Sequence, residues 1–374
     1  MARIVLAPDK FKGSITARDV AAQVGAGITA VLPDAELVVV PVSDGGDGLL
    51  DVALSVGFER VDVEASGPLE EPVSSWYAVR GDEVVIEMAE ICGLARASDL
   101  DAMGATSRGL GEAIATALDR GANSVLLGIG GSASTDGGAG VLEALGARLL
   151  DGSGSPCPPG GGGLLALASI DLSALHPRLT EVTITVACDV DNPLTGPRGA
   201  AAVYGPQKGA KPDQVAALDQ ALTRLADIVS DATGSNVRDA AGAGAAGGVG
   251  YAALAVLGAT LRSGVDVVLD LVDFADALEG ADLVVTGEGM LDEQTLNGKA
   301  PAGVAAAARA RGIPVVAVCG ARSLSDELLR KAGIGAVHVI SDLATEPRES
   351  FERPGPLLQR AGRAIARELK DSRT

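Results

Sequence analysis

Charged side chains and glycines gather where short apolar stretches of the chain end. Residues 8–14, with the sequence PDKFKGS, place two lysines beside an aspartate just before a predicted helix. Ammonium groups and the N–H groups at the start of a helix are suited to binding an anion. The alternative is a solvated turn in which Ser14 caps the helix. Lys10, Lys12 and Ser14 are therefore candidate ligands for a carboxylate or a phosphate.

The strongest nucleotide signal is the glycine-rich segment 128–138 (GIGGSASTDGG), which follows a predicted strand. Glycines allow a ligand to approach the backbone closely, and hydroxyls with the start of a helix complete a phosphate cradle. The segment also fits a loose dinucleotide pattern, which is weak in a chain with 50 glycines. It is not a Walker A loop, because the Gly-Lys pair at 298–299 precedes Ala and lacks the upstream glycine. The candidate nucleotide ligands here are Gly130, Gly131, Ser132 and Asp136.

Carboxylates follow several other predicted strands. Asp44, between glycines in SDGGDG, suits magnesium or a substrate hydroxyl. Asp189 in ACDVDNP comes directly after an apolar run, where it could act as general base on a hydroxyl or hold a cation. Glu288 in TGEG has a similar position, flanked by glycines. The alternative for each is a tight turn or a helix cap. Nearby candidates are Asp191, Asp292 and Lys299.

Another predicted helix opens with Thr106, Ser107 and Arg108. Hydroxyls, a guanidinium group and free N–H groups together can hold a carboxylate or a phosphate. The alternative is a capping Thr with an exposed Arg. Lys208, between turn residues in GPQKG, is predicted to lie in a solvated loop.

Composition narrows the classes of function. Thirty Lys and Arg against 49 Asp and Glu give a formal charge of -19, which argues against nucleic-acid or anionic-membrane binding. The chain has four cysteines, none in CxxC spacing, and two histidines. They provide few ligands for a zinc site and few candidates for the histidine of a Ser-His-Asp triad. Any metal is therefore expected to be magnesium on carboxylates. The N-terminus lacks the pattern of a signal peptide, which predicts a cytoplasmic protein.

Strands alternating with Ala/Leu-rich helices predict an α/β fold in which functional loops follow the strands. The pattern holds at both ends of the chain, and a strand hairpin interrupts it around residues 80–82. We predict a Rossmann-like outer domain from residues 1–75 and 270–374. A second α/β domain, residues 76–269, is inserted, with the active-site cleft between the two.

Four helices are predicted within the inserted region, over residues 106–120, 138–149, 212–233 and 240–261. The last of these is an uncharged stretch, long enough to span a membrane but dominated by Gly and Ala. We therefore expect it to be a buried, glycine-led helix.

Eight ordered segments resemble the motifs of the bacterial glycerate kinases of the first type. They are APDKFKGSITA, VPVSDGGDG, TSRGLGE, GIGGSASTDGGAG, ACDVDNPLTG, YGPQKGA, GAGAAGGVG and VVTGEGMLDEQTLNGKAPAGVA. The resemblance covers essentially the whole chain. It implies magnesium-assisted phosphoryl transfer from ATP to a hydroxyl of D-glycerate, with 2-phosphoglycerate favoured over 3-phosphoglycerate. Met290 departs from the family's usual Arg after TGEG, and Asn297 from the His common before Gly-Lys.

Phosphoryl transfer requires mainly positioning and neutralisation of charge, so the resemblance and the residue types together suggest roles. The predicted catalytic residues are Asp189, Lys10 and Glu288. The predicted substrate ligands are Lys12, Ser14, Asp44, Thr106, Ser107 and Arg108. The predicted nucleotide ligands are Gly130, Gly131, Ser132, Asp136 and Lys299. The predicted magnesium ligands are Asp189, Asp191 and Asp292.

Two other classes of function stay open. A nicotinamide-dependent oxidoreductase would use the loose glycine pattern, although no acidic residue stands in a clear βαβ context. A non-catalytic protein that closes on a small hydroxy acid would bind without ATP. The expected partners are small molecules in each case, and a homo-oligomer is compatible with all of them.

Overall fold

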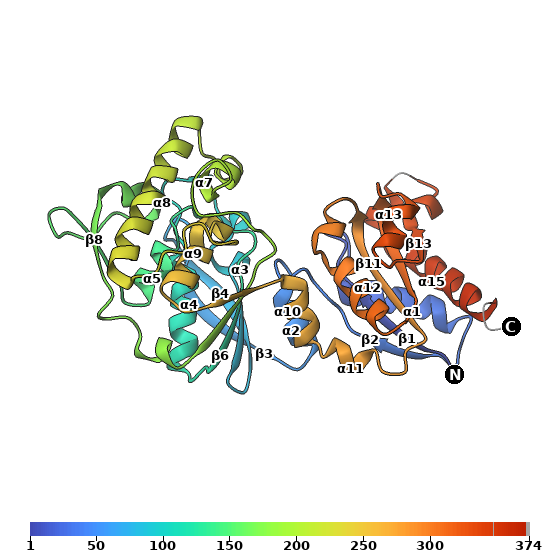
Figure 1. Cartoon of the computed structure of the whole chain (residues 1–374). Helices are drawn as coiled ribbons and strands as arrows, with labels where there is room; N and C mark the ends of the chain where they lie inside the picture. Colours follow the sequence, from blue (N-terminus) through green and yellow to red (C-terminus); the bar gives the residue numbers. More distant parts are fainter. Residues whose placement is uncertain (347, 372–374) are drawn as a thin grey trace. The chain divides into compact units, whose positions relative to one another are not determined.

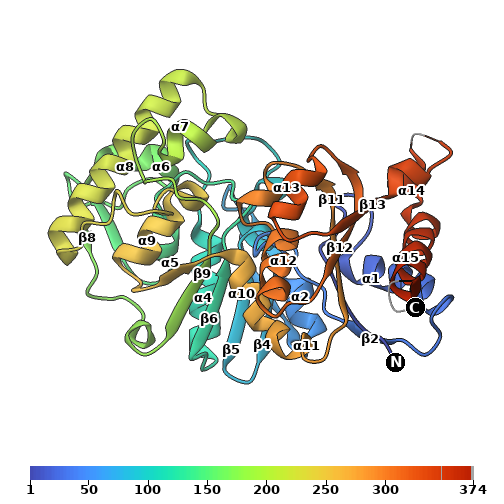
Figure 2. The same ribbon diagram turned by 45° about the vertical axis from the view of Figure 1, so that its right-hand side comes forward.

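The computed structural model describes residues 1–346 and 348–371 and divides into two units (Figures 1 and 2). Unit 1 is Met1–Asp44 with Val265–Thr374, and unit 2 is Gly45–Gly264. Both units combine sheets with helices, as the predicted α/β class requires. The division at 44/45 precedes the predicted boundary at 75/76, because strand β3 (Glu59–Ser66) pairs with β4 (Pro72–Arg80) in the sheet of unit 2.

The sheet of unit 1 is parallel and has the strand order β13-β12-β11-β1-β2. Its strands are β1 (Arg3–Pro8), β2 (Glu36–Val39), β11 (Leu283–Leu291), β12 (Val315–Arg322) and β13 (Ala336–Val339). The pairing of β1 with β11 runs from Ile4↔Leu283 to Pro8↔Gly287. Residues far apart in the sequence thus form the centre of one sheet, and their following loops leave from the same edge.

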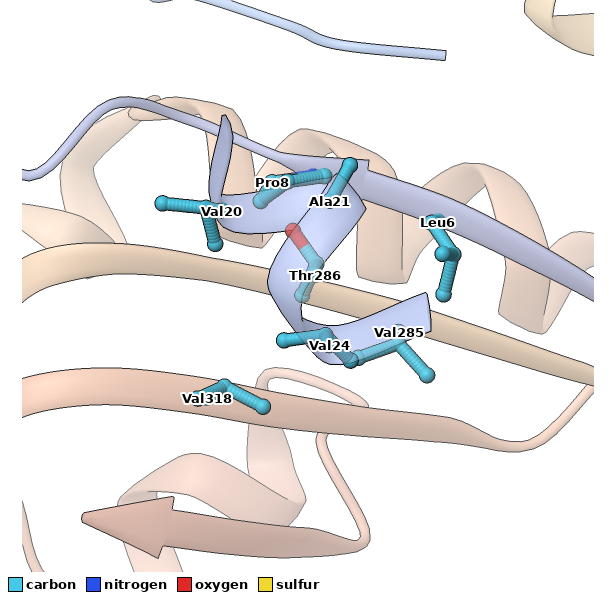
Figure 3. Close-up of a pocket in the computed structure, with 8 residues that line it drawn as sticks. All are labelled: Leu6, Pro8, Val20, Ala21, Val24, Val285, Thr286 and Val318. Atoms are coloured by element: carbon cyan, nitrogen blue, oxygen red, sulfur yellow. The ribbon is translucent and has the colours of Figure 1, made fainter. Parts of the chain in front are cut away.

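The helices of unit 1 are α1 (Ala17–Thr29), α11 (Phe274–Ala277), α12 (Ala300–Ala310), α13 (Asp326–Lys331), α14 (Glu349–Glu352) and α15 (Pro354–Asp371), with α10 (Gly264–Leu271) at the unit boundary. Helices α1, α12 and α15 pack on the strands of the sheet. Helices α1 and α15 lie side by side, since a Cβ at Gly27 would stand 2.2 Å from the Gln359 carbonyl oxygen (Figure 1). Figure 3 shows α1 beside the strands, where Val20, Val24 and Leu6 line a small apolar cavity. This packing fixes the strand ends from which the loops emerge.

Unit 2 has a sheet of order β10-β9-β6-β5-β4-β3. Its further strands are β5 (Glu83–Glu87), β6 (Ser124–Gly128), β9 (Thr183–Ala187) and β10 (Thr260–Arg262), with β7 (Arg148–Asp151) and β8 (Leu167–Asp171) forming a separate hairpin. Strands β5, β6, β9 and β10 are parallel, whereas β4 pairs with β5 in an antiparallel hairpin. The predicted hairpin is confirmed, and the parallel strands again gather their following loops at one edge.

The helices of unit 2 differ from prediction in two places. They are α2 (Leu49–Ser55), α3 (Ala89–Cys92), α4 (Arg108–Asp119), α5 (Ala139–Ala144), α6 (Gly160–Gly163), α7 (Ala200–Tyr204), α8 (Pro212–Thr233) and α9 (Val249–Ala255). The helix predicted over 138–149 ends early, because Gly146 has φ 106° and β7 follows. The helix predicted over 240–261 is only α9, because Ala246 and Gly247 adopt left-handed φ values. Throughout residues 1–346 and 348–371, no helix is both long and apolar enough to cross a membrane.

Candidate functional site

The parallel strands of unit 2 end in one aligned row. Glu87 pairs with Gly128, Gly128 pairs with Ala187, and Ala187 pairs with Arg262. The segments that follow these residues therefore leave the sheet beside one another. They contain the glycine-rich segment 128–138 and Asp189, which the sequence singled out.

Glycines let these segments touch through their backbones. A Cβ at Gly45 would stand 2.5 Å from the Gly264 Cα atom, and one at Gly128 would stand 3.0 Å from the Gly45 carbonyl oxygen. A Cβ at Gly130 would meet the Gly46 Cα atom at 3.2 Å. The glycines of SDGGDG and GIGGS are thus required by close packing at the strand ends, whatever ligand they also serve.

Glu87 anchors the first of these loops. Its side chain is buried and accepts hydrogen bonds from the N–H groups of Gly48 and Leu50, at the start of α2. Burial raises the pKa of Glu87 to about 7, and these N–H groups act in the opposite direction. The sequence analysis did not select Glu87, because an acid at the end of an apolar strand gives no local sign of what it will face.

In the glycine-rich segment of unit 2, Gly130 and Gly131 are exposed whereas residues 132–138 are buried. We call residues 128–138 the glycine loop. The Asp136 carboxylate accepts four hydrogen bonds, from the amide and hydroxyl of Ser107 and the amides of Gly138 and Gly140. Asp136 therefore orders the loop, and a direct bond from it to a nucleotide would have to replace these bonds.

The predicted ligands 106–108 stand beside the glycine loop. Thr106 and Ser107 are buried, and the Ser107 hydroxyl both donates to Asp136 and accepts from the Val141 amide. Arg108 is half-buried, with its Nε 3.1 Å from Glu112 Oε1. Thr106 and Ser107 thus hold the start of α4 against the loop, and Arg108 keeps a partly exposed guanidinium there.

Lys208 is the clearest correction to the sequence analysis. It was predicted to be solvated, but it is 2% exposed. Its ammonium group donates to the Ser132 hydroxyl at 2.8 Å and to the Ser134 carbonyl. Burial lowers the pKa of Lys208 to about 8, against the attraction of Asp136. The turn residues around Lys208 indicate a loop, but only the tertiary structure places that loop beneath the glycine loop.

Asp189 is exposed at the end of β9, and its Oδ1 accepts a hydrogen bond from the Gly264 amide at 2.8 Å. Asp191 is exposed as well, and both of its oxygens lie 3.0 Å from Arg198 Nη2. The two aspartates therefore have different neighbours: Asp189 accepts a backbone hydrogen bond at the strand end, whereas Asp191 is paired with a guanidinium group.

Unit 1 places charged side chains at its own strand ends. The Asp9 amide donates to the Gly287 carbonyl at 2.8 Å, and the Lys10 amide donates to the Asp9 carboxylate at 2.6 Å. Burial and the charges of Asp44 and Glu288 raise the pKa of Asp9 to about 8. The structure thus brings Asp9, Asp44 and Glu288 together, with Lys10 adjacent in the chain. Asp9 was not among the predicted site residues.

Glu288 is the buried member of a small ionic network. Thr295 Oγ1 donates to Glu288 Oε1 at 2.5 Å, and Lys299 Nζ lies 3.6 Å from Glu288 Oε2 and 4.0 Å from Asp292 Oδ1. Burial raises the pKa of Glu288, while the Thr295 hydroxyl and Lys299 lower it. The predicted residues Glu288, Asp292 and Lys299 therefore form one cluster.

The other predicted residues of unit 1 lie around this cluster or face elsewhere. Lys12 is exposed in the tight turn from Phe11 to Ile15, and the Ser14 hydroxyl donates to the Phe351 carbonyl, so it is engaged by α14. Met290 is 42% exposed. The side chain of Asn297 lies outside the described part of the structure.

The residues present fit magnesium only when phosphate oxygens complete its shell. Among the described residues, no three His, Cys, Asp or Glu side chains form a group that could hold a metal ion. Magnesium in nucleotide enzymes usually takes one or two carboxylates together with phosphates and water. Asp189 in unit 2 and Asp292 in unit 1 fit that requirement. Asp191 could bind magnesium only if its ion pair with Arg198 broke.

The comparisons with known proteins agree along the full length. A model of the "Glycerate kinase family" matches residues 4–370. The glycerate kinase of Bacillus subtilis (strain 168) is 45% identical over 377 residues, 100% of this chain and 99% of that protein. The glycerate 2-kinase of Escherichia coli (strain K12) is 42% identical over 375 residues, 98% of each.

A solved structure extends this agreement to the fold. The crystal structure of a protein named as a glycerate kinase 2 from Salmonella typhimurium LT2 matches with a TM-score of 0.89 and 41% identity, covering 100% of this chain and 99% of that one. The motif resemblance is therefore confirmed over the whole chain by sequence and by fold, and the chain belongs to the glycerate kinase family.

Proposed function

We propose that this protein transfers the γ-phosphoryl group of ATP to D-glycerate, with magnesium, and that 2-phosphoglycerate is the product. Full-length membership of the glycerate kinase family carries the proposal. The preference for the 2-phosphate rests on the relative named glycerate 2-kinase, which is 42% identical over almost the whole chain. The local geometry supplies what such a reaction needs: an exposed glycine tip and carboxylates at strand ends.

The glycine loop is the proposed site for the phosphates of ATP. Its tip, Gly130 and Gly131, is exposed and carries no side chain that would keep a phosphate from the backbone. Ser132 and Asp136 are both buried, so their proposed role is to support the tip from inside the protein. Phosphoryl transfer requires mainly fixed donors and charge neutralisation, and a loop anchored on several sides provides fixed donors.

Asp189 is the proposed base for the glycerate hydroxyl. It lies at the end of β9, next to the strand that leads into the glycine loop, and the Gly264 amide fixes one of its oxygens. Its proposed task is to accept the proton of the attacking hydroxyl. Magnesium, when bound through Asp189 or Asp292, would neutralise charge on the phosphates. The cations proposed for the glycerate carboxylate or for phosphate oxygens are Lys10, Lys12, Arg108 and Lys299.

The test is ADP formation from ATP and magnesium with and without D-glycerate, followed by phosphorus NMR of the product. We expect glycerate-dependent ADP formation and the signal of the 2-phosphate. The signal of the 3-phosphate would correct the regiochemistry alone. Intact ATP binding without turnover would point to a different acceptor acid, and a saturable change in NAD(P)H fluorescence without ADP formation would favour the oxidoreductase. Loss of turnover in EDTA, restored by magnesium, tests the metal.

A further inference from the structure

The glycine loop is held from two sides. On one side, the Leu94 amide donates to the Gly131 carbonyl at 2.7 Å, and the Ala133 amide donates to the Cys92 carbonyl at 3.4 Å. On the other side stands Lys208, whose ammonium group donates to the Ser132 hydroxyl and the Ser134 carbonyl. The first set of bonds holds Gly131 in the exposed tip and Ala133 behind it, and the second set holds Ser132 and Ser134.

The side-chain hydroxyls of the loop do not explain its conformation. Ser134 and Thr135 are fully buried, and their hydroxyl oxygens have no hydrogen-bond partner within the described part of the chain. Unpaired buried hydroxyls oppose folding. Gly131 and Gly137 also require left-handed φ values of 70° and 66°. The loop therefore keeps its shape through bonds to other segments: Asp136 holds its end before α5, and the Lys208 ammonium, from outside the loop, holds Ser132 and Ser134.

A buried ammonium group is not expected at a position whose only role is to stabilise the fold. Buried charges are costly, and replacing them with apolar side chains of similar size is often neutral or stabilising. Asp136, the carboxylate that attracts Lys208, already accepts four hydrogen bonds from other groups. The positive charge of Lys208 thus lies beneath the part of the loop that would face an anion.

We infer that Lys208 is a positioning residue for nucleotide phosphates: its buried ammonium fixes residues 132–134 of the glycine loop and adds positive charge beneath the exposed tip. Lys208 does not itself reach the ligand, because it is enclosed by the loop. The inference rests on the proposed function. It adds a role for one cation, the ammonium group of Lys208, which holds the glycine loop in place. A preorganised loop binds phosphate without a cost of ordering at the moment of binding.

The test compares Lys208→Met, which keeps the length and removes the charge, with Lys211→Met at an exposed lysine on the same segment. We expect Lys208→Met to raise the KM for ATP at least tenfold and to lower kcat, with the KM for D-glycerate within twofold of wild type and the urea midpoint maintained. Lys211→Met should match wild type. Unchanged values for ATP in Lys208→Met, or an equal rise in both KM values, would overturn the inference.

A second variant keeps the inference testable if Lys208→Met fails to fold. Ser132→Ala removes only one acceptor of the ammonium, and we expect a three- to tenfold rise in the KM for ATP; no rise would overturn the inference. Calorimetric titration with magnesium-ATP separates this inference from the proposed function. A wild-type protein that binds ATP but does not turn over glycerate refutes the proposed function, while the loss of ATP affinity in Lys208→Met still tests the lysine.

Discussion

The two units have different kinds of groups at the ends of their parallel strands. In unit 1, side-chain charges meet at the ends of β1 and β11, where Asp9, Asp44, Glu288 and Lys299 influence one another. In unit 2, the edge is built mainly from backbone, with glycines in contact and buried hydroxyls below them. Lys208 is the buried cation that supports that backbone.

This difference predicts different responses to mutation. A site made of charges should respond to pH and to removal of single charges. A site made of closely packed backbone should lose stability when a methyl group is added. Its response to pH should be limited to buried groups such as Lys208 and Glu87. Four measurements test the contrast.

The largest expected effect is that of Asp189→Asn, which replaces an exposed carboxylate at a strand end of unit 2 and keeps an oxygen for the Gly264 amide. We expect kcat to fall by roughly 10²- to 10⁴-fold, the range for loss of a general base, with unchanged unfolding by urea. Asp231→Asn, at an exposed position on α8, is the control. Near-normal turnover in Asp189→Asn, with a large loss in Glu288→Gln, would move the base to unit 1.

The backbone packing of unit 2 is tested by Gly45→Ala. Gly45 has φ 80°, and a Cβ would stand 2.5 Å from the Gly264 Cα atom, so we expect a loss of roughly 3 kcal/mol or more in the free energy of unfolding. Gly234→Ala is matched, since Gly234 has φ 73° but nothing within 4 Å. It should lose only about 1–2 kcal/mol. Equal losses by urea denaturation would remove close packing as the reason for Gly45.

Lys299→Met tests the charge network of unit 1. Lys299 lowers the pKa of the buried Glu288, so its removal raises that pKa further and favours the protonated acid. If ionised Glu288 is needed, the loss of kcat/KM should be largest at low pH, at most about tenfold for each unit by which the pKa rises, and should diminish as the pH rises. Lys331→Met, at an exposed position on α13, is the control. An equal loss across the pH range would separate Lys299 from Glu288.

The last prediction concerns stability and not catalysis, in Asp9→Asn. The pKa of Asp9 is about 8 in the folded protein against 3.8 ordinarily, so the folded state holds this proton more tightly than the unfolded chain. Asp9 therefore contributes stability below pH 4 that is lost as the pH rises to 8. The urea midpoint of Asp9→Asn, compared with wild type, should increase from pH 5 to pH 9. The same difference at both pH values would contradict the raised pKa.

Local sequence patterns were sufficient where the signal is local. The apolar alternation predicted most strands of the two larger sheets and the hairpin, but not β7, β8 or β10. The glycine clusters marked the strand ends, because backbone conformation and turn residues act over a few positions. The ordered motifs identified the family. Length and capping patterns also gave α8 its bounds, Pro212–Thr233, since proline begins it and a left-handed Gly234 ends it.

The candidate site was predicted less well, because exposure depends on what packs from elsewhere in the chain. Ser132 and Asp136 have the residue types of phosphate ligands, yet both are buried. Glu87 and Lys208 look like an ordinary strand end and an ordinary surface turn, yet each supports a glycine-containing loop. Their partners are distant in sequence, so no local pattern contains them.

The sequence by itself determined the fold class, the family and the segments that carry chemistry, since these depend on periodicity, residue type and motif order. Tertiary structure alone decided which members of those segments face outward and which serve as supports. The physical reason is that hydrogen-bond satisfaction and burial are properties of the packed chain. A lysine becomes a buried support only when the Ser132 hydroxyl and the Ser134 carbonyl, more than seventy positions away, enclose it.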